Sequence, residues 1–207
     1  MSRNITTQAT PFALLEAAMM HFLTLTPLLF AFPVLSTLLF TDFPHLLVSL
    51  NKDQANSPLG TFPFATVSNS VWTEVNFDVH PKAEYPAAIC RINFHINTNG
   101  AKNAPRYLDG DAPYTFQVFR LQPEINKWAD TWNNHPKLLE DWPTATITLT
   151  EQGDVTVDGG WFECPFGQVA QFLVKPVGDK DFTYYWYELD YPASDGGPHG
   201  ITLEMHS

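Results

Sequence analysis

Side chains suited to binding a ligand cluster first at the turn Thr131–Pro136, where Trp132 precedes Asn133 and Asn134. A Trp ring can stack on a flat apolar face such as that of a pyranose ring, and neighbouring amides can bind its hydroxyl groups. The alternative is a purely structural turn, since Asn tolerates left-handed φ and Trp132 can plug the end of the fold. We favour the structural interpretation and keep the three residues as candidate sugar ligands.

A second group of aromatic residues is the run Phe182–Tyr187, in which five of the six side chains are rings. Alternation along a β-strand places three rings on one face, namely Phe182, Tyr184 and Trp186. The rings of Tyr185 and Tyr187 then lie on the opposite face, with Trp72 and Trp161 as candidate neighbours. This second face is either a cross-strand packing ladder, which we favour, or an exposed strip that stacks sugar rings.

Evidence for catalysis is weak. Neither G-x-S-x-G nor H-E-x-x-H occurs. Five of the seven histidines are scattered among expected turns and solvated faces, namely His45, His80, His95, His135 and His199. The rival hypothesis is a carbohydrate-active hydrolase that uses Glu188 with Asp190 or Glu163. Glu188 and Asp190 share a face only if their strand continues, and a glycosidase needs two carboxylates across a cleft. We predict a non-catalytic protein.

Metal and cofactor sites have little support. Asp109 and Asp111, like Asp179 and Asp181, present carboxylates two residues apart, which Ca²⁺ could use. Both pairs lack the Gly and terminal Glu of an EF-hand loop, so solvated turns are the favoured interpretation. No C-x-x-C or Cys/His spacing suggests zinc. No cofactor is predicted.

The charge of the chain excludes one class of partner. The formal net charge is −11, charged residues make up 16% of the chain and aromatic residues 14%. Such an acidic surface repels nucleic acid and anionic lipid, and no Lys/Arg cluster offsets it. We therefore exclude nucleic-acid binding, and the composition is typical of an extracellular β-protein.

The N-terminal segment 1–41 is predicted to be a leader, because the run 19–41 contains no Asp, Glu, Lys or Arg. As a signal peptide it would have its apolar core at 22–34 and its cleavage site after Ser36. As a membrane anchor the run 19–41 is also long enough, although Pro27 and Pro33 weaken a straight helix. Translation from Met19 or Met20 would give a more ordinary leader. Secretion is favoured, and residues 42–207 are predicted to form one domain.

Two cysteines are present, Cys90 and Cys164. They are either buried free thiols, as in cytosolic proteins, or a disulfide formed in an oxidising compartment. If the chain is secreted, the disulfide is favoured. It would stabilise the fold by about 4 kcal/mol at most on the chain-entropy model.

Hydrophobic residues with a period of two dominate the chain after the leader. In the run 71–79 the apolar side chains share one face, namely Val71, Val75, Phe77 and Val79. The polar side chains are predicted to face solvent, namely Glu74, Asn76 and Asp78. The run 90–97 alternates in the same way, with an inward face made of Cys90, Ile92, Phe94 and Ile96.

Further strands are predicted at Phe43–Leu50, Tyr114–Leu121, Ala145–Thr150, Val155–Val157, Gly167–Lys175, Phe182–Leu189 and Gly200–Met205. The short loop Glu151–Asp154 should close a hairpin, because its Gly can adopt positive φ. Pro123–Trp132 has room for one helical turn. Many short strands separated by turn residues predict a two-sheet antiparallel β-sandwich, jelly-roll-like, with an N-terminal apolar leader.

Several segments together resemble a known family. They are FPHLLVSLNKDQANSPLGT, CRINFHINT, DAPYTFQVFRL, DTWNNHP, FECPFGQVAQFLV and YWYELDYPASDGGPHGITLEM. They are similar to the fungal ubiquitin-three-binding protein (But-two) C-terminal domain family, over about Phe43 to Met205. The resemblance implies a β-domain of extracellular, cell-surface type without established catalysis. The family name implies a ubiquitin-like partner, and the resemblance supplies no site residues.

The combined hypothesis is a secreted, non-catalytic β-sandwich at the cell surface. Its expected partner is a cell-wall polysaccharide or a surface protein. The alternatives left open are the hydrolase and an intracellular adaptor for a ubiquitin-like protein. The turn Thr131–Pro136 is also faintly similar to turns of carbohydrate-binding jelly rolls.

Overall fold

A computed structural model describes residues 36–178 and 181–207, which belong to one compact unit. The predicted signal-peptide core and Asp179 lie outside the described residues. Within the described ranges, no helix has the length and apolarity that crossing a membrane requires.

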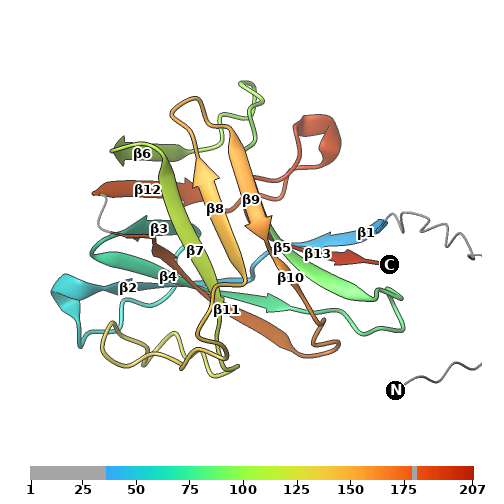
Figure 1. The fold of residues 1–207 in the computed structure, drawn as a ribbon, viewed down its shortest axis with the longest axis horizontal. Coiled ribbons are helices and arrows are strands. Elements are labelled where there is room, and N and C mark those ends of the chain that lie inside the picture. The colour runs from blue at the N-terminus through green and yellow to red at the C-terminus, as the bar shows by residue number, and fades with distance from the viewer. Residues whose placement is uncertain (1–35, 179–180) are drawn as a thin grey trace, which may run out of the picture. The chain divides into compact units, whose positions relative to one another are not determined.

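The described chain is built almost entirely of antiparallel strands (Figure 1). They are β1 (Leu38–Asp42), β2 (Leu46–Asn51), β3 (Phe64–Ser68), β4 (Val71–Asp78), β5 (Ile89–His95), β6 (Arg106–Gly110), β7 (Tyr114–Arg120), β8 (Ala145–Leu149), β9 (Val155–Gly159), β10 (Trp161–Phe162), β11 (Val169–Pro176), β12 (Phe182–Tyr187) and β13 (Gly200–His206). Two short 3-10 helices, η1 (Lys52–Gln54) and η2 (Ala193–Asp195), interrupt them. The segment Pro123–Trp132, which has room for one helical turn, contains a single turn in which the N–H groups of Ala129 and Asp130 both donate to the carbonyl of Asn126.

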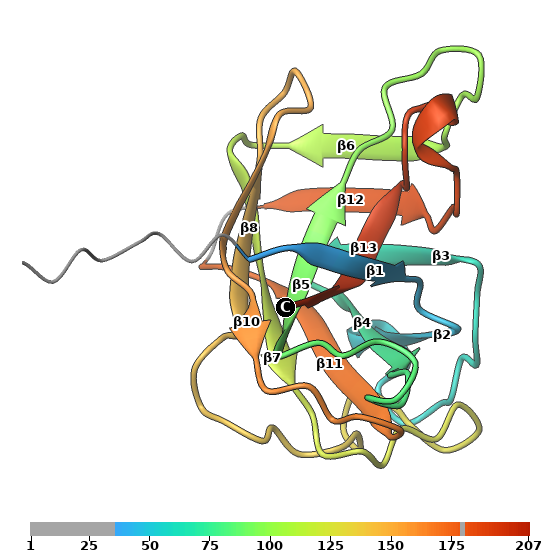
Figure 2. The same cartoon turned by 90° about the vertical axis from the view of Figure 1, so that its right-hand side faces the viewer.

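The strands form three sheets, with the orders β1-β13-β5-β10, β2-β4-β11-β7-β8-β9 and β3-β12-β6. One core joins them, because Phe94 of the first, Phe116 of the second and Trp186 of the third are in mutual ring contact. The centroid of Phe94 lies 5.6 Å from that of Phe116 and 5.2 Å from that of Trp186. The predicted all-β antiparallel sandwich is confirmed, and one of its layers is divided into two sheets (Figure 2).

Side-chain alternation accounts for most of this core. Phe182, Tyr184 and Trp186 are all buried on the inner face of β12, as the sequence predicts. The hairpin predicted around Glu151–Asp154 is also present, since β8 pairs with β9 and Gly153 has φ +89°. That positive φ suits Gly because it has no Cβ.

The predicted solvent face of β4 is wrong in part. Asp78 is exposed, but Glu74 and Asn76 are buried. The reason is the long connection 121–144 between β7 and β8, which covers the outer face of the six-stranded sheet. A second apolar cluster lies beneath it, made of Val48, Leu50, Leu121 and Leu173, with Trp132 packed against it.

The end of the predicted leader contributes a strand to the domain. Residues 38–41 belong to β1, which pairs with β13, so that Thr41 lies opposite Glu204. Phe40 stacks on Tyr85 with 4.4 Å between the ring centroids. The predicted disulfide is present: Cys90 of β5 is bonded to Cys164, and no free cysteine remains.

Candidate functional site

The outer face of the sheet β3-β12-β6 carries a group of aromatic side chains. Tyr185 of β12 lies directly opposite Tyr107 of β6, and Tyr187 lies opposite Phe64 of β3. Directly opposed residues of antiparallel strands share a face, so these rings lie on the same surface. It is the face opposite to the buried Trp186, because side chains alternate along β12.

Four of these rings are in contact with one another, and the fifth, Tyr107, lies beside them opposite Tyr185. We call the five the aromatic strip: Phe62, Phe64, Tyr107, Tyr185 and Tyr187. The centroid of Phe64 is 5.0 Å from that of Phe62, 4.9 Å from that of Tyr185 and 5.7 Å from that of Tyr187. Tyr107 is 55% exposed and the other four rings are half-buried. The sequence interpretation of two aromatic faces on this strand is therefore correct.

A polar depression of about 520 Å³ adjoins the aromatic strip at Tyr185. Its other walls come from the β5–β6 connection and the start of β6, and include Asn97, Asn99, Asn103 and Arg106. The amide of Asn97 donates to the carbonyls of Asp195 and Gly197, which holds this connection against η2. Rings and rigid amides therefore lie side by side at one end of the strip.

The turn Thr131–Pro136 is a packed element. Trp132 lies on Trp72, with 4.0 Å between the ring centroids. The side-chain amide of Asn133 donates to Oδ1 of Asn56 at 3.0 Å, and the backbone N–H of Asn134 donates to the Thr131 hydroxyl at 3.1 Å. These contacts follow the structural interpretation, although Asn133 and Asn134 remain exposed.

The two tryptophans expected near Tyr185 lie elsewhere. Trp72 packs on Trp132, and Trp161 contacts the ring of His206 at 4.9 Å and the guanidinium of Arg91 at 5.1 Å. Among the ring contacts of the described residues, neither tryptophan reaches the aromatic strip. Alternation along a strand predicts the face of that strand on which a side chain lies. It does not predict which other strand or sheet packs against that face.

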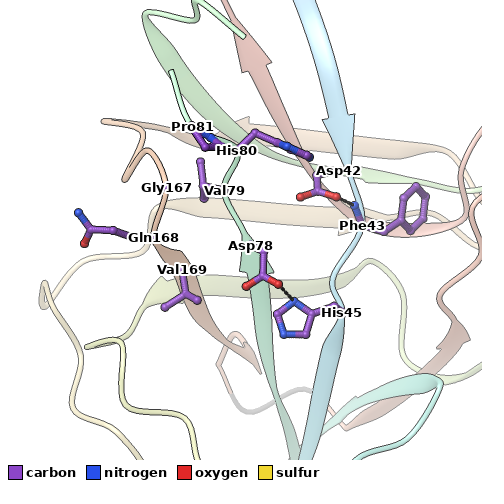
Figure 3. A pocket seen from close by; sticks show the side chains of 10 residues that line it. All are labelled: Asp42, Phe43, His45, Asp78, Val79, His80, Pro81, Gly167, Gln168 and Val169. Carbon is purple, nitrogen blue, oxygen red and sulfur yellow. Dashed lines mark hydrogen bonds and ion pairs between the residues drawn. The ribbon is translucent and has the colours of Figure 1, made fainter. Parts of the chain in front are cut away.

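Two carboxylates and two imidazoles meet in a cleft of about 450 Å³ that sequence reasoning missed (Figure 3). Asp42 and His45 come from the end of β1 and the connection to β2, and Asp78 and His80 come from the end of β4 and just beyond. His45 Nδ1 lies 2.9 Å from Asp78 Oδ2. Burial raises the pKa of Asp42, while the N–H of Phe43 and the neighbouring imidazoles oppose that rise.

This cleft is poorly suited to acid–base catalysis. If His45 Nδ1–H donates to Asp78, its other nitrogen, Nε2, accepts from the amide of Asn76 at 3.1 Å. The lone pair that a general base needs is then already engaged. Within residues 36–178 and 181–207, no group of three His, Cys, Asp or Glu side chains is placed to hold a metal ion.

The carboxylates of the hydrolase hypothesis do not share a cleft. Glu188 is enclosed: its Oε1 accepts from Trp186 Nε1 at 2.7 Å and from the N–H of Ile201 at 2.9 Å. Burial raises its pKa to about 8. Asp190 and Glu163 are exposed, and β12 ends at Tyr187, before the residues that would have to share its face. Asp109 and Asp111 lie at the exposed end of β6 and just after it.

His199 and Glu204 are two further polar residues whose burial was not predicted from the sequence. His199 is fully buried and accepts the N–H of Asn97 on Nδ1, and burial lowers its pKa to about 4. Burial acts to raise the pKa of Glu204, but bonds from His95, Asn93 and His206 outweigh it and bring it to about 2. His199 was among the histidines expected in turns or on solvated faces, whereas it is buried and forms a β-bridge with Leu189.

A comparison with models of known protein families gives a match over most of the chain. The model of the family described as "Ubiquitin 3 binding protein But2 C-terminal domain" matches residues 42–188, which is most of the chain. A search of curated proteins found no match.

Proposed function

Because the chain belongs to the But2 C-terminal domain family, we propose that it is a non-catalytic binding domain, and that it binds carbohydrate outside the cell through the aromatic strip. The observation that carries this proposal is the gathering of five rings on one face of a sheet, with Tyr107 the most exposed of them.

The chemistry of the strip supports a carbohydrate ligand. Tyrosine offers a flat apolar face together with one hydroxyl, which suits a sugar ring with its C–H groups on one side and hydroxyls around it. The adjoining depression adds the amides of Asn99 and Asn103 beside Tyr185. Ring stacking with a few fixed polar groups is the usual composition of a small-ligand site.

Two features support an extracellular location. The Cys90–Cys164 disulfide is typical of oxidising compartments. Cleavage after Ser36 would also leave β1 complete, because that strand starts at Leu38. A membrane anchor over the full run 19–41 would compete with the pairing of Thr41 with Glu204.

A ubiquitin-like protein is the second candidate ligand. The observation that favours it is the family description, which names a ubiquitin 3 binding protein. The aromatic strip would serve as the contact surface here too, since exposed aromatic side chains are enriched in protein interfaces.

The test is retention of the protein on a panel of insoluble cell-wall polysaccharides, with a ubiquitin-like protein immobilised in parallel. We expect retention on at least one polysaccharide, and a Tyr107→Ala, Tyr185→Ala variant should lose about tenfold or more in affinity, as for truncated interface hot spots. Trp142→Ala is the matched control, because Trp142 is 64% exposed but lies outside the strip.

Each outcome separates the candidates. Loss of binding in the tyrosine variant with full binding in the Trp142 variant supports the proposal. Retention only on the ubiquitin-like protein would replace the carbohydrate with the second candidate. Equal loss in both variants, or no retention of the unaltered protein on any polymer, would refute a role of the strip in carbohydrate binding.

A further inference from the structure

Strand β6 is an edge strand with an open backbone. It pairs only with β12, and the flanking bonds fix which of its residues face that neighbour. The N–H of Tyr187 donates to the carbonyl of Pro105, and the N–H of Asp111 donates to that of Asp181. Because hydrogen-bonded residues alternate in an antiparallel ladder, Tyr107 and Asp109 also face β12.

The backbone groups of Arg106, Leu108 and Gly110 therefore point away from the sheet. Within the described residues, the one bond recorded on that side joins the Tyr114 hydroxyl to the carbonyl of Gly110, at 3.2 Å. A row of unpaired N–H and C=O groups is a template for another strand. Figures 1 and 2 both show β6 at the outer edge of its sheet.

Three other sheet edges of this domain are covered or distorted. The outer edge of β3 is tied by Thr73, whose hydroxyl accepts from the N–H of Thr66 and donates to its carbonyl. A bridge from Thr61 to Val48 covers part of β2, and β1 carries a register shift between Leu38 and Phe40. Such devices keep edges from pairing with other chains. The register of β6 is unbroken, and its sequence RYLDG contains no Pro or Lys.

The charges along β6 favour one arrangement of two copies. Arg106 lies opposite the buried Trp186 and shares its side of the sheet, whereas Asp109 shares the side of Tyr107. In a two-fold antiparallel arrangement centred on Leu108, Arg106 of each copy lies opposite Gly110 of the other, and Asp109 lies opposite Tyr107, so no like charges are opposed. An in-register parallel arrangement would instead place Arg106 beside Arg106 and Asp109 beside Asp109, which is destabilising. The antiparallel arrangement also presents the same residues from both copies, as a symmetric interface requires.

We propose that two copies of this chain associate by antiparallel pairing of their β6 strands, centred on Leu108. In this register, Leu108 of each copy exchanges both backbone bonds with Leu108 of the other. Arg106 lies opposite Gly110, whose carbonyl would accept the Arg106 N–H beside the Tyr114 hydroxyl that it already accepts. The two three-stranded sheets become one six-stranded sheet. The aromatic strips of both copies then lie on the same face, although the pairing does not depend on what those strips bind.

Molar mass and hydrogen exchange of the unaltered protein test the pairing without any substitution. Sedimentation at about 0.15 M salt, where the repulsion between two acidic copies is screened within about 8 Å, should show mass rising toward a dimer as concentration increases. Hydrogen exchange of the Leu108 amide should become slower as the fraction of dimer increases. The amides of Tyr107 and Asp109 should be protected at every concentration, because β12 already holds them.

Leu108→Pro is the direct variant, since Pro removes an N–H that the sheet of the monomer does not use. It should weaken association about tenfold or more, because each copy loses an intermolecular bond. Leu108→Ala is the matched control, because it shortens the side chain and keeps the N–H, and it should associate as the unaltered protein does. Circular dichroism reports whether each variant folds.

The proposal fails if the unaltered protein stays monomeric up to millimolar concentration. It also fails if association protects a different strand while the Leu108 amide still exchanges freely. If Leu108→Pro does not fold, the concentration dependence of exchange in the unaltered protein decides. Equal association of the folded Pro and Ala variants would equally contradict pairing through β6.

Discussion

Glu188 shows how a carboxyl group is kept in the core of this domain. Both of its hydrogen bonds are accepted by Oε1, while Oε2 is buried without a partner in the described structure and lies against Gly200. A Cβ at Gly200 would collide with this carboxyl group, and the φ of +119° there is one that other residues rarely adopt, so Gly is strongly favoured. Since burial raises the pKa of Glu188 to about 8, the group is protonated at neutral pH.

The first prediction concerns the pH dependence of stability. Between the unfolded value of 4.5 and the folded value of about 8, the unfolded chain releases a proton that the folded chain keeps. Glu188 therefore stabilises the fold below the lower value, and this contribution decreases by about 1.4 kcal/mol per pH unit across the window. Glu188→Gln should remove that slope.

Urea unfolding of both proteins at several pH values measures this effect. The Gln variant should gain stability relative to the unaltered protein as the pH rises from about 4.5 to about 8. The lowered pKa of His199 makes stability rise with pH in both proteins. This contribution cancels when the unfolding free energy of one protein is subtracted from that of the other. A difference independent of pH would show that Glu188 is ionised in the folded state.

Glu188 and His199 also show what cannot be predicted from the sequence about a single residue. Alternation correctly places Tyr184 and Trp186 inside and Tyr185 and Tyr187 outside. It cannot tell which polar side chain a later segment covers, because that depends on contacts between distant parts of the chain. His45 and Asp78 meet for the same reason, as β2 and β4 are paired.

The connection 121–144 acts as a cover on the six-stranded sheet. Ile125 packs into the second apolar cluster, and its N–H donates to Oε1 of the buried Gln171 at 2.9 Å. Beneath the cover, Glu74 lies between Val48 and Leu173 in register and interacts with Asp130 of the connection. Burial, and then the charge of Asp130, raises the pKa of Glu74 to about 9.

The second prediction follows from this pair of carboxyl groups. Burial raises the pKa of Asp130 as well, and a proton held by Glu74 keeps the pair from carrying two negative charges. Ionisation would bury a second charge beside Asp130. The stabilising contribution of protonated Glu74 decreases as the pH rises from 4.5 to about 9, so the connection should loosen as the pH approaches 9. Glu74→Gln should keep it closed.

Proteolysis gives a local measurement, since Lys127 and Lys137 both lie in this connection. Trypsin should cut the unaltered protein faster than the Gln variant at about pH 9 and at a similar rate at about pH 6, with the pH effect on the enzyme cancelling between the two proteins. Faster cleavage of the Gln variant at both pH values would mean that the carboxyl group stabilises the cover through its own bonds.

Strand prediction succeeded where apolar and polar residues alternate clearly and failed where they do not. The predicted runs Val71–Val79 and Phe182–Leu189 contain β4 and β12, and the predicted run Ala145–Thr150 contains β8. Strands β1, β3, β6 and β10 were not predicted. Asp109 and Gly110 are typical turn residues, yet they end β6, because pairing with β12 outweighs their weak local preference for strand.

The disulfide ties together parts of the chain that are distant in sequence. Cys90 and Cys164 are 74 residues apart, and Cys90 lies in the central strand β5 of its sheet. Cross-linking a loop of this length removes conformations from the unfolded chain. The third prediction is that the double variant Cys90→Ala, Cys164→Ala loses up to about 4 kcal/mol of unfolding free energy.

Denaturant unfolding of the double variant tests this value, and the unaltered protein treated with a reductant is the control for the substitutions themselves. Both should show the same loss, because each opens the same loop. A much larger loss in the double variant than in the reduced protein would point to the packing of the two side chains rather than to the cross-link.

The last prediction concerns the contribution of β1, at the start of the domain, to stability. A chain beginning at Thr37 keeps β1, so that Phe40 still stacks on Tyr85 and the edge of β13 stays covered. A chain beginning at Phe43 loses both and should be less stable by about 2 kcal/mol or more, close to the burial value of one large apolar side chain. Chemical denaturation of the two trimmed chains measures the difference.

If secretion removes the leader after Ser36, the mature protein in culture medium should start at Thr37, as mass spectrometry of its N-terminus would show. Cleavage beyond Asp42 would remove a strand that the fold uses, so finding it in a stable secreted product would contradict the role of β1. Equal stability of the chains beginning at Thr37 and Phe43 would contradict it independently. Export and folding thus constrain the same short segment, because the last residues of the apolar run pair with the final strand.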